Sequence, residues 1–502
     1  MTTSGTTSGA ERGAGAGPAD GAGDARALGS PAWELLLPAA AAPARQRGRA
    51  LQSALREAVR GGRLAAGTRL PSSRELAADL GVSRGLVTEA YEQLIAEGYL
   101  RSNRGSGTWV GDVARSPAHA ARDHTPRPPG VRVDFRPGSP DPALFPRAAW
   151  AAAHRSVLAE LPHEALGYPD PRGLPRLRTA LAALLTRRRG VVADPDRLVV
   201  CSGVTQSMAL LSQVARAHGQ RAVGVEDPGS PGHSNVFDAA GLRMVPLPLD
   251  GEGLLLEPLR RSGVRTVFTT PAHQFPLGIA YAARRRTELL HWARSVDGLV
   301  VEDDYDGEFR YDRAPVGAMQ GLDPEHVAYS GSVSKSLVPG LRLGWLVVPE
   351  RLLEETVARK LAMDLGNPVI DQALFADFVE SGAYDRQLRR CQRAYRERRD
   401  ALVAALDRYF PGTEAGGIAA GLHVIARLPA RYGPEDDFLE RARRAGVGVT
   451  PLSAHRVADH GPAGADGGTD SGADGEGVRL VLGYAHLPPA EIARGIALLA
   501  GS

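Results

Sequence analysis

Lysine is rare in this chain, and one of its two lysines stands where an amine could do chemistry. Of the 60 lysine and arginine residues, only Lys335 and Lys360 are lysines. A lysine side chain can lose its proton inside a protein and an arginine side chain does not. A lysine kept in an arginine-rich chain therefore favours a role for a neutral amine. Lys335 lies in SGSVSKSLVPGLRLGW, among hydroxyl groups and ahead of an arginine.

A buried amine of this kind can form a Schiff base with the aldehyde of pyridoxal phosphate, once burial has lowered its pKa. Ser332, Ser334 and Arg342 stand close enough in the sequence to hold the phosphate of that cofactor. The alternative for Lys335 is an ordinary surface lysine, which is how we interpret Lys360 in VARKLAMD.

Two further motifs offer partners for the same cofactor. The apolar run LVV leads into EDDYD, about thirty residues before Lys335. At the end of a buried strand, Asp303 can accept the protonated pyridine nitrogen, and Tyr305 can donate to the phenolic oxygen. The run SGVTQ, residues 202–206, follows the strand-like VVC and opens a helix, so its backbone N–H groups can cradle a phosphate. An acidic surface turn and an ordinary helix start are the alternatives.

The elements that must position these motifs alternate along the chain. Between residues 133 and 499, strand-like runs such as RLVVCSG, RAVGVEDPG and LRLGWLVV alternate with helical stretches of ten or more residues. This alternation predicts a mostly parallel α/β sheet with ligand-binding groups on loops at the strand ends. The motifs above fall on such loops.

Three short helices and a hairpin are predicted within residues 50–110. Apolar residues recur at helical spacing in LQSALREAV, and Ser72 with Glu75 forms a capping box at the start of SRELAADL. Ser83 caps a third helix, whose buried stripe leaves Arg84 and Thr88 on the outward side. Strands at residues 99–101 and 108–110 flank the turn SNRGSG and form a small β-wing.

This order of helices and wing is the geometry in which the second helix of a pair enters the major groove of DNA. Residues 41–110 hold eleven arginines against six acidic residues, a charge of +5, so the remainder of the +3 chain sums to about −2. A local basic segment on a near-neutral body is typical of a nucleic-acid reader joined to a separate domain. The alternative is a three-helix packing module without a ligand.

Length and composition indicate a soluble, cytoplasmic protein of two or three domains. The chain has 502 residues, 43% of them hydrophobic, and no apolar run approaches the ~18 residues of a membrane span. Its N-terminus lacks a signal-peptide pattern. Cys201 and Cys391 form no metal spacing or disulfide framework, and we interpret them as packing residues. We predict a disordered tail at residues 1–30, a DNA-binding domain at 31–112, a linker at 113–131 and an effector domain at 132–502 with a disordered loop at 461–477.

Residues 50–110 resemble the winged helix-turn-helix of GntR-type repressors, whose LPSxRxLAxxLGVSRxTVxxAYxxLxxEG pattern they follow almost throughout. The resemblance implies an α+β DNA-binding domain whose contacts with double-stranded DNA come from Arg74, Ser83, Arg84 and Thr88, and from the wing residues Gly107 and Thr108. Gly85 stands where the family usually has a larger side chain, which weakens base readout and lowers helix propensity there.

The motifs YPDPRG, SGVTQ, TPAHQFPLG, EDDYDGEFRY and SVSKSLVPGLRLGW together resemble the fold type I aminotransferases, an α/β/α sandwich with a small C-terminal α+β subdomain. With the GntR-like head, residues 45–499 are similar to the MocR subfamily of GntR regulators. The resemblance implies a Schiff base between Lys335 and pyridoxal phosphate, which is held by Asp303, Tyr305, Arg342, Ser332, Val204, Thr205 and Tyr168. Because Tyr168 matches a tyrosine that reaches the neighbouring subunit's phosphate, a head-to-tail, domain-swapped homodimer is implied.

Two positions depart from the aminotransferase pattern. Ser230 in EDPGSPG stands where an aromatic side chain usually stacks on the cofactor ring, so ring packing is looser or comes from elsewhere. The carboxylate-binding arginine of aminotransferases precedes an LSYA-like strand, but here Val481 precedes LGYA. Arg479 lies two residues upstream, on the same face of a strand, and is the candidate partner of an effector carboxylate. A plain strand-end charge is the alternative.

We predict a transcription regulator that binds its DNA operator as a dimer and senses a small amino compound, or pyridoxal phosphate itself. In this hypothesis an amino compound displaces Lys335 to form an external aldimine, which shifts the DNA-binding heads between two arrangements. The regulated genes would serve amino-acid or vitamin B6 metabolism. Two alternatives stay open: a working aminotransferase with an autoregulatory head, and a large domain that is only a dimerisation scaffold.

Overall fold

The computed structural model of the protein describes residues 36, 39, 41–103, 107–112, 130–311, 316–417, 419–457 and 477–501. The predicted tail at 1–30, residues 113–129 of the predicted linker and residues 461–476 of the predicted loop lie outside the described residues. The chain divides into two compact units, Met1–Pro126 and Arg127–Ser502, and each is described by itself.

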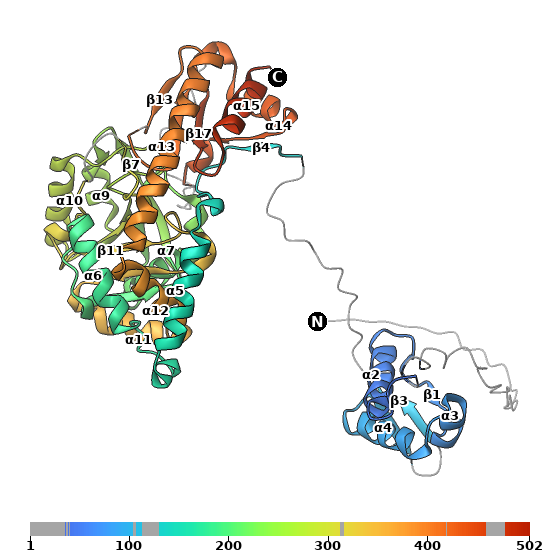
Figure 1. Ribbon diagram of the computed structural model, residues 1–502. Helices are drawn as coiled ribbons and strands as arrows, with labels where there is room; N and C mark the ends of the chain where they lie inside the picture. The colour runs from blue at the N-terminus through green and yellow to red at the C-terminus, as the bar shows by residue number, and fades with distance from the viewer. Residues whose placement is uncertain are drawn as a thin grey trace, which may run out of the picture. The chain divides into compact units, whose positions relative to one another are not determined.

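The described part of the first unit includes the helices α2, α3 and α4 and a small antiparallel sheet (Figure 1). Its helices are α2 (Arg47–Arg60), α3 (Ser73–Leu80) and α4 (Arg84–Ala96). Its sheet has the order β1-β3-β2, with β1 at Arg69–Leu70, β2 at Leu100–Asn103 and β3 at Gly107–Val110. One apolar core joins all three helices to the sheet.

Local sequence accounts for where α3 and α4 begin and end. The Ser72 side chain accepts a hydrogen bond from the Glu75 N–H and the Glu75 side chain bonds back, which is the predicted capping box. Gly81 ends α3 in the left-handed conformation, and the Ser83 side chain caps α4. The first wing strand starts one residue later than predicted, because the Tyr99 N–H still bonds the Leu94 carbonyl at the end of α4.

The second unit is built on an eight-stranded sheet of order β5-β12-β11-β10-β9-β6-β7-β8. Its strands are, in that order, Leu198–Cys201, Gly344–Val347, Val327–Ser332, Leu299–Asp303, Thr266–Thr269, Ala222–Asp227, Arg243–Asp250 and Gly253–Leu254. β12 and the edge strand β8 run opposite to the other six strands, which all share one direction, so the prediction of a mostly parallel α/β sheet is confirmed.

Helices cover both faces of this sheet, as alternating burial along its strands requires. Along β5, Val199 and Cys201 pack into a cluster with α7, α8 and α11, whereas Leu198 and Val200 face a cluster with α6, α12 and α13. The helices of this part are α5 (Arg147–Glu160), α6 (Pro175–Arg189), α7 (Val204–Ala217), α8 (Ser234–Ala239), α9 (Leu256–Ser262), α10 (Ala283–Ser295), α11 (Glu350–Asp364) and α12 (Val369–Glu380). Cys201 and Cys391 are both buried and unpaired, as predicted.

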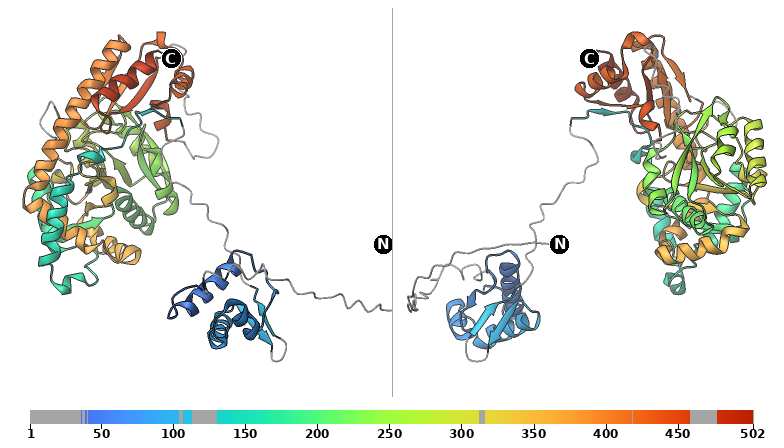
Figure 2. Two further views of the ribbon diagram at one scale, coloured as in Figure 1. Left: turned by 45° about the vertical axis from the view of Figure 1, so that its right-hand side comes forward. Right: turned by 180° about the vertical axis from the view of Figure 1, so that it is seen from behind.

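A smaller subdomain completes the second unit. Its four-stranded sheet has the order β13-β14-β17-β16, with strands at Glu414–Gly416, His423–Arg427, Arg479–Gly483 and Thr450–Pro451, and it carries α14 (Glu435–Arg444) and α15 (Pro489–Ala500). The 27-residue α13 (Ala383–Tyr409) runs along one side of the unit and reaches this subdomain (Figures 1 and 2). β4 (Val133–Asp134) pairs with β15 (Val447–Gly448), so the start of the unit is held by its C-terminal part.

Candidate functional site

A cavity of about 290 Å³ lies where the central strands of the large sheet end. β10 ends at Asp303 and β11 at Ser332, directly before the turn that carries Lys335. The cavity wall includes seven residues that the sequence predicted for one site: Val204, Thr205, Asp303, Tyr305, Ser332, Lys335 and Arg342. These residues come from loops after three strands, as expected for a sheet of this kind.

Lys335 is held in the cavity by a backbone contact. Its Nζ donates a hydrogen bond to the Gly138 carbonyl, in the segment that follows β4. Burial lowers the pKa of Lys335 below that of an ordinary amine, although the carboxyl groups of Asp306 and Asp303 oppose this shift. A lowered pKa favours the neutral, nucleophilic amine.

Four carboxyl groups crowd residues 302–306, and three of them have partners. Asp304 pairs with the buried Arg189 at 2.6 Å. Glu302 accepts hydrogen bonds from the backbone N–H groups of Met319 and Gln320, at the start of the 3-10 turn η7 (Gln320–Leu322), and Asp306 lies 2.8 Å from the His273 ring. Asp303 Oδ1 is buried without a hydrogen-bond partner among the described residues.

Asp303 is therefore available to a ligand. Burial, with Asp304 and Asp306 nearby, raises the pKa of Asp303 to about 8, while Lys335 opposes the shift. A buried acceptor without a partner costs free energy, and a protonated pyridine nitrogen would satisfy it. The chemistry of Asp303 fits the ring of pyridoxal phosphate.

The opposite side of the cavity suits a phosphate. Val204 and Thr205 begin α7, where backbone N–H groups lack intrahelical partners. Arg342, in the left-handed conformation at φ 48°, donates to the Ser202 carbonyl at 2.5 Å. A Cβ built on Gly203 would lie 3.2 Å from the Arg342 guanidinium, so glycine keeps this cradle open. Lys335, Asp303 and this cradle together fit pyridoxal phosphate.

Sequence reasoning missed several residues of the site, among them His273. Tyr305 Oη lies 3.1 Å from His273 Nδ1, which also contacts Asp306. Glu226 lines the cavity and accepts hydrogen bonds from Thr270, Gln274 and Tyr281. His273 and Gln274 belong to the quoted motif TPAHQFPLG, which could have identified both.

The cavity wall around Ser230 contains other rings. Phe237, Phe268 and Phe275 all line it, and Phe237 packs edge-on against Phe268 with ring centroids 4.9 Å apart. His233, three residues after Ser230, also lines the cavity, and burial lowers its pKa. These rings supply apolar surface that Ser230 lacks.

Lys360 is not the surface lysine that its sequence suggested. It is fully buried, and its Nζ donates to both carboxylate oxygens of Asp364 at 2.7 Å and to Asn367 Oδ1 at 2.8 Å. Asn367 donates to Ser202 Oγ, while Gln206 bonds both Asp364 and the Ser202 N–H. The prediction was wrong because these partners come together only in the folded chain. Lys360 thereby helps to hold the loop at Ser202 that leads into α7.

Two predicted residues lie outside the cavity wall. Tyr168 is 91% exposed. The next residue, Pro169, lies against the turn at residues 363–367, where a Cβ built on Gly366 would be 2.8 Å from its ring. Arg479 begins β17 opposite Arg427 and does not line the cavity. Their roles stay predictions.

The predicted DNA-contact residues of the first unit lie on α3, at the start of α4 and on the wing, and most of them are exposed. Ser83 and Arg84 are exposed at the start of α4, as is Arg74 on α3. Thr88 is half-buried and donates to the Arg84 carbonyl. Gly107 and Thr108 lie on β3 of the wing, where the guanidinium of Arg69, which sequence reasoning missed, approaches Gly107 and the Trp109 ring.

Comparison with known proteins supports both units. Residues 48–110 match the family described as bacterial regulatory proteins, gntR family, and residues 137–463 match aminotransferase class I and II. A relative from Rhizobium meliloti, the probable rhizopine catabolism regulatory protein MocR, is 36% identical, with 89% of this chain and 92% of the relative covered. The HTH-type pyridoxine biosynthesis transcriptional regulator PdxR of Corynebacterium glutamicum is 34% identical, with 83% and 90% covered.

A solved structure supports the fold of the second unit. The kynurenine aminotransferase of Pyrococcus horikoshii, in complex with PMP, is 26% identical at a TM-score of 0.64, and the match covers 74% of this chain and 90% of that one. The predicted aminotransferase-like fold is thus confirmed.

Replacing Lys360 by methionine tests the buried network. We expect the free energy of unfolding in urea to fall by about 2–4 kcal/mol, because Asp364 loses its cation inside the protein. Affinity for pyridoxal phosphate should fall too. Arg359→Met is the control, since Arg359 pairs with Glu355 near the surface and its loss should cost less than about 1 kcal/mol. Equal effects of the two substitutions would contradict the structural role of Lys360.

Replacing Asp303 by asparagine tests the raised pKa in cofactor-free protein. The unfolded chain releases this proton near pH 4, but the folded chain keeps it to about pH 8, so wild-type stability falls as the pH rises between them. The stability of Asp303→Asn relative to wild type should therefore increase from about pH 5 to about pH 8 in urea titrations. The exposed Asp238→Asn is the control. A pH-independent difference would count against the shift.

Proposed function

We propose that this chain, which belongs to the MocR-type transcription regulators of the GntR family, uses its aminotransferase-like unit as a sensor that holds pyridoxal phosphate. When bound, this cofactor would supply an aldehyde that condenses with amines. Lys335, Asp303 and Tyr305 would hold its ring, and Arg342, Ser332 and the start of α7 its phosphate.

The hydrogen bond from Lys335 to Gly138 is the observation that carries the sensor proposal. Gly138 lies only a few residues after β4, where the second unit follows residues 113–129. A lysine committed to a ligand through its nitrogen has fewer protons to donate to the Gly138 carbonyl. Occupation of the cavity would therefore weaken a contact of the segment at residues 130–138, which leads along the chain to the DNA-binding unit.

We further propose that the signal is a small amino compound or pyridoxal phosphate itself. The printed names of the relatives concern rhizopine catabolism in one case and pyridoxine biosynthesis in the other. These two names support a regulator that controls genes of amino-acid or vitamin B6 metabolism. Because the DNA that such a regulator binds is chromosomal, we place the protein in the cytoplasm.

A homodimer would complete the site. Two segments beside the proposed phosphate-binding loop lie against each other and expose apolar side chains. These side chains are Leu166 and Tyr168 on one segment and Met363 and Leu365 on the other. The Gln206 side chain contacts both Met363 and Asp364, which joins this patch to the start of α7. Exposed patches of this kind favour association, and a second copy could bring its own Tyr168 to the phosphate. We therefore keep the head-to-tail, domain-swapped homodimer as a proposal.

A working aminotransferase is the second candidate function. The buried Lys335 and the unpaired Asp303 are the groups that such an enzyme needs. Both relatives are named as regulators, and the matches cover most of their length, which favours the sensor.

Substitution of Lys335 separates these functions. Full-length protein loaded with pyridoxal phosphate is titrated with amino acids, D-amino acids and amines while its visible spectrum and its affinity for labelled DNA are followed. A stable spectral shift with altered DNA affinity is expected for the sensor, and Lys335→Ala should lose the response but keep DNA binding.

Lys335→Arg is the matched control, because it keeps a donor for Gly138 but offers no neutral amine. Conversion to the pyridoxamine form with release of an oxo acid would support the enzyme instead. A change in DNA affinity on adding pyridoxal phosphate alone, without a shift from any amine, would identify the cofactor as the signal. DNA affinity that follows neither addition would contradict both sensor forms.

Replacing Arg84 by alanine tests the recognition helix. Duplexes selected from a random pool by the full-length protein should contain two related half-sites, as a dimer requires. Arg84→Ala should weaken binding to the selected duplex by about 1–3 kcal/mol if Arg84 reads a guanine. Arg63→Ala removes the same charge from an exposed position outside α4 and is the control. Unchanged affinity of Arg84→Ala would exclude α4 as the reading helix.

A further inference from the structure

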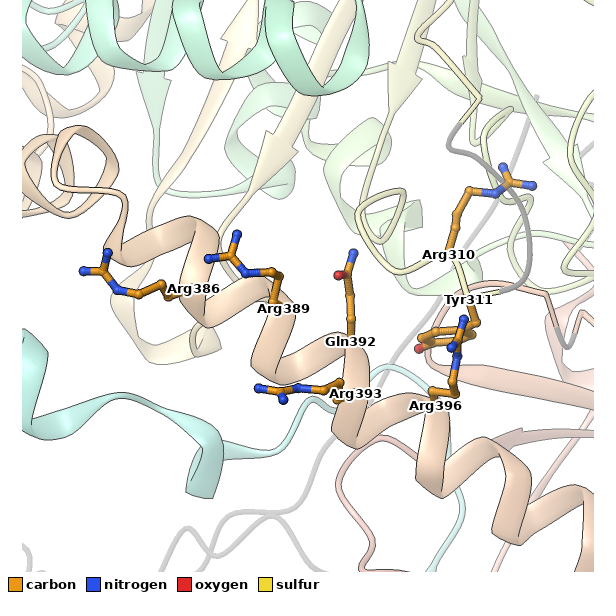
Figure 3. A pocket seen from close by; sticks show the side chains of 7 residues that line it. All are labelled: Arg310, Tyr311, Arg386, Arg389, Gln392, Arg393 and Arg396. Carbon is orange, nitrogen blue, oxygen red and sulfur yellow. The ribbon is translucent and has the colours of Figure 1, made fainter.

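A second hollow, of about 570 Å³, lies on the surface of the second unit and shares no lining residue with the cavity at Lys335. Its lining comes from two elements: a loop after β10, and one side of the long helix α13 (Figure 3). The lining residues are Arg310, Tyr311, Arg386, Arg389, Gln392, Arg393 and Arg396. Among the described residues, five arginines and no acidic side chain line this hollow.

Four of these arginines form a stripe along α13. Arg386, Arg389, Arg393 and Arg396 are spaced three, four and three residues apart, which places them on one face of a helix. All four are exposed. At a rise of 1.5 Å per residue, the stripe extends about 15 Å along the helix axis.

Three of the four arginines in this stripe lack an acidic partner in the described residues. In the part of the chain that the structure describes, Arg386, Arg389 and Arg393 form no ion pair. Asp385, the first acidic residue of α13, is held by Arg187 and Arg188 at 2.8 and 3.1 Å. Like charges three or four residues apart destabilise a helix, so the stripe is a cost to α13 unless an anion offsets it.

We propose that this stripe binds the phosphate backbone of DNA that flanks the site bound by the first unit. Each strand of B-DNA carries one phosphate per 3.4 Å of axis, so a 15 Å stripe spans about four phosphates. Guanidinium groups bind phosphate oxygens in pairs, and contacts to the backbone carry no sequence information. The contact is therefore independent of sequence and adds affinity to what α4 supplies.

DNA is the polyanion that the observations favour. The chain belongs to a family of DNA-binding regulators, so DNA held by the first unit is the polyanion that the stripe would meet. The 17 residues between Asp112 and Gly130 can span at most about 60 Å. This length allows the second unit to reach DNA that extends beyond the site bound by the first unit. Among the described lining residues the only apolar group is the ring of Tyr311, which is buried, so these residues offer no surface for stacking a base.

The test neutralises three arginines in the full-length, cofactor-loaded protein. Affinity of Arg386→Gln/Arg389→Gln/Arg393→Gln for a labelled 60-base-pair duplex of unrelated sequence is measured by fluorescence anisotropy across a salt series. Each phosphate contact contributes about 0.9 to the slope of log affinity against log salt, so the slope should fall by about 2 to 3. The thermal unfolding midpoint of this triple variant should equal or exceed that of the wild type, because charge repulsion along α13 is relieved.

A matched variant separates local contact from net charge. Arg261, Arg284 and Arg494 each pair with a glutamate on their own helix, and changing all three to glutamine removes the same three charges. This control should keep the wild-type slope. Equal slopes in the two variants would overturn the proposal. An unchanged DNA slope with lost binding of tripolyphosphate in the stripe variant would also overturn it, since the hollow would then be a site for small anions.

Discussion

The need to bury four carboxyl groups at the end of β10 constrains the rest of the second unit. Parallel pairing with β11, in which Asp303 lies opposite Ser330, fixes where this acidic run emerges. Arg189 from α6, backbone N–H groups of the η7 turn and His273 from the loop after β9 then answer three of the four acids. Elements far apart in sequence are thereby tied to one point. The fourth acid, Asp303, keeps a buried Oδ1 that has no hydrogen-bond partner among the described residues.

Residue type and strand position were enough to find the centre of this site. Lys335 and Asp303 could be predicted because a strand end and a rare amine are both visible in one sequence. The same rarity applied to Lys360, which we interpreted as a surface lysine, although Lys360 is fully buried and Lys335 is half-buried. A compact ammonium can donate to three oxygens in a closed space, which a planar guanidinium does less well. Rarity indicated a constrained position in both cases, but not which constraint.

Other site residues depend on contacts that form only in the folded chain. His273 lies in a motif that could be quoted from the sequence, but its contact with Asp306 joins two loops that are more than thirty residues apart. Tyr168 is 91% exposed, so no contact within the described chain accounts for the role that the resemblance implies for it. The arginine stripe on α13 was present in the sequence as RQLRRCQRAYR, but only the fold shows that its arginines share one helix face and that the carboxylate of Asp385 pairs with Arg187 and Arg188 instead.

The pairing of β4 with β15 also bears on how the protein is made. Val133 and Val447 stand about 310 residues apart, so at 5–20 residues per second the first strand of the second unit waits roughly 15 to 60 s for its partner during synthesis. The first unit closes its own core within residues 36–110 and needs nothing downstream. On the ribosome, a finished reading head therefore precedes a sensor that is still incomplete. Nascent chains can meet DNA before they can respond to any signal.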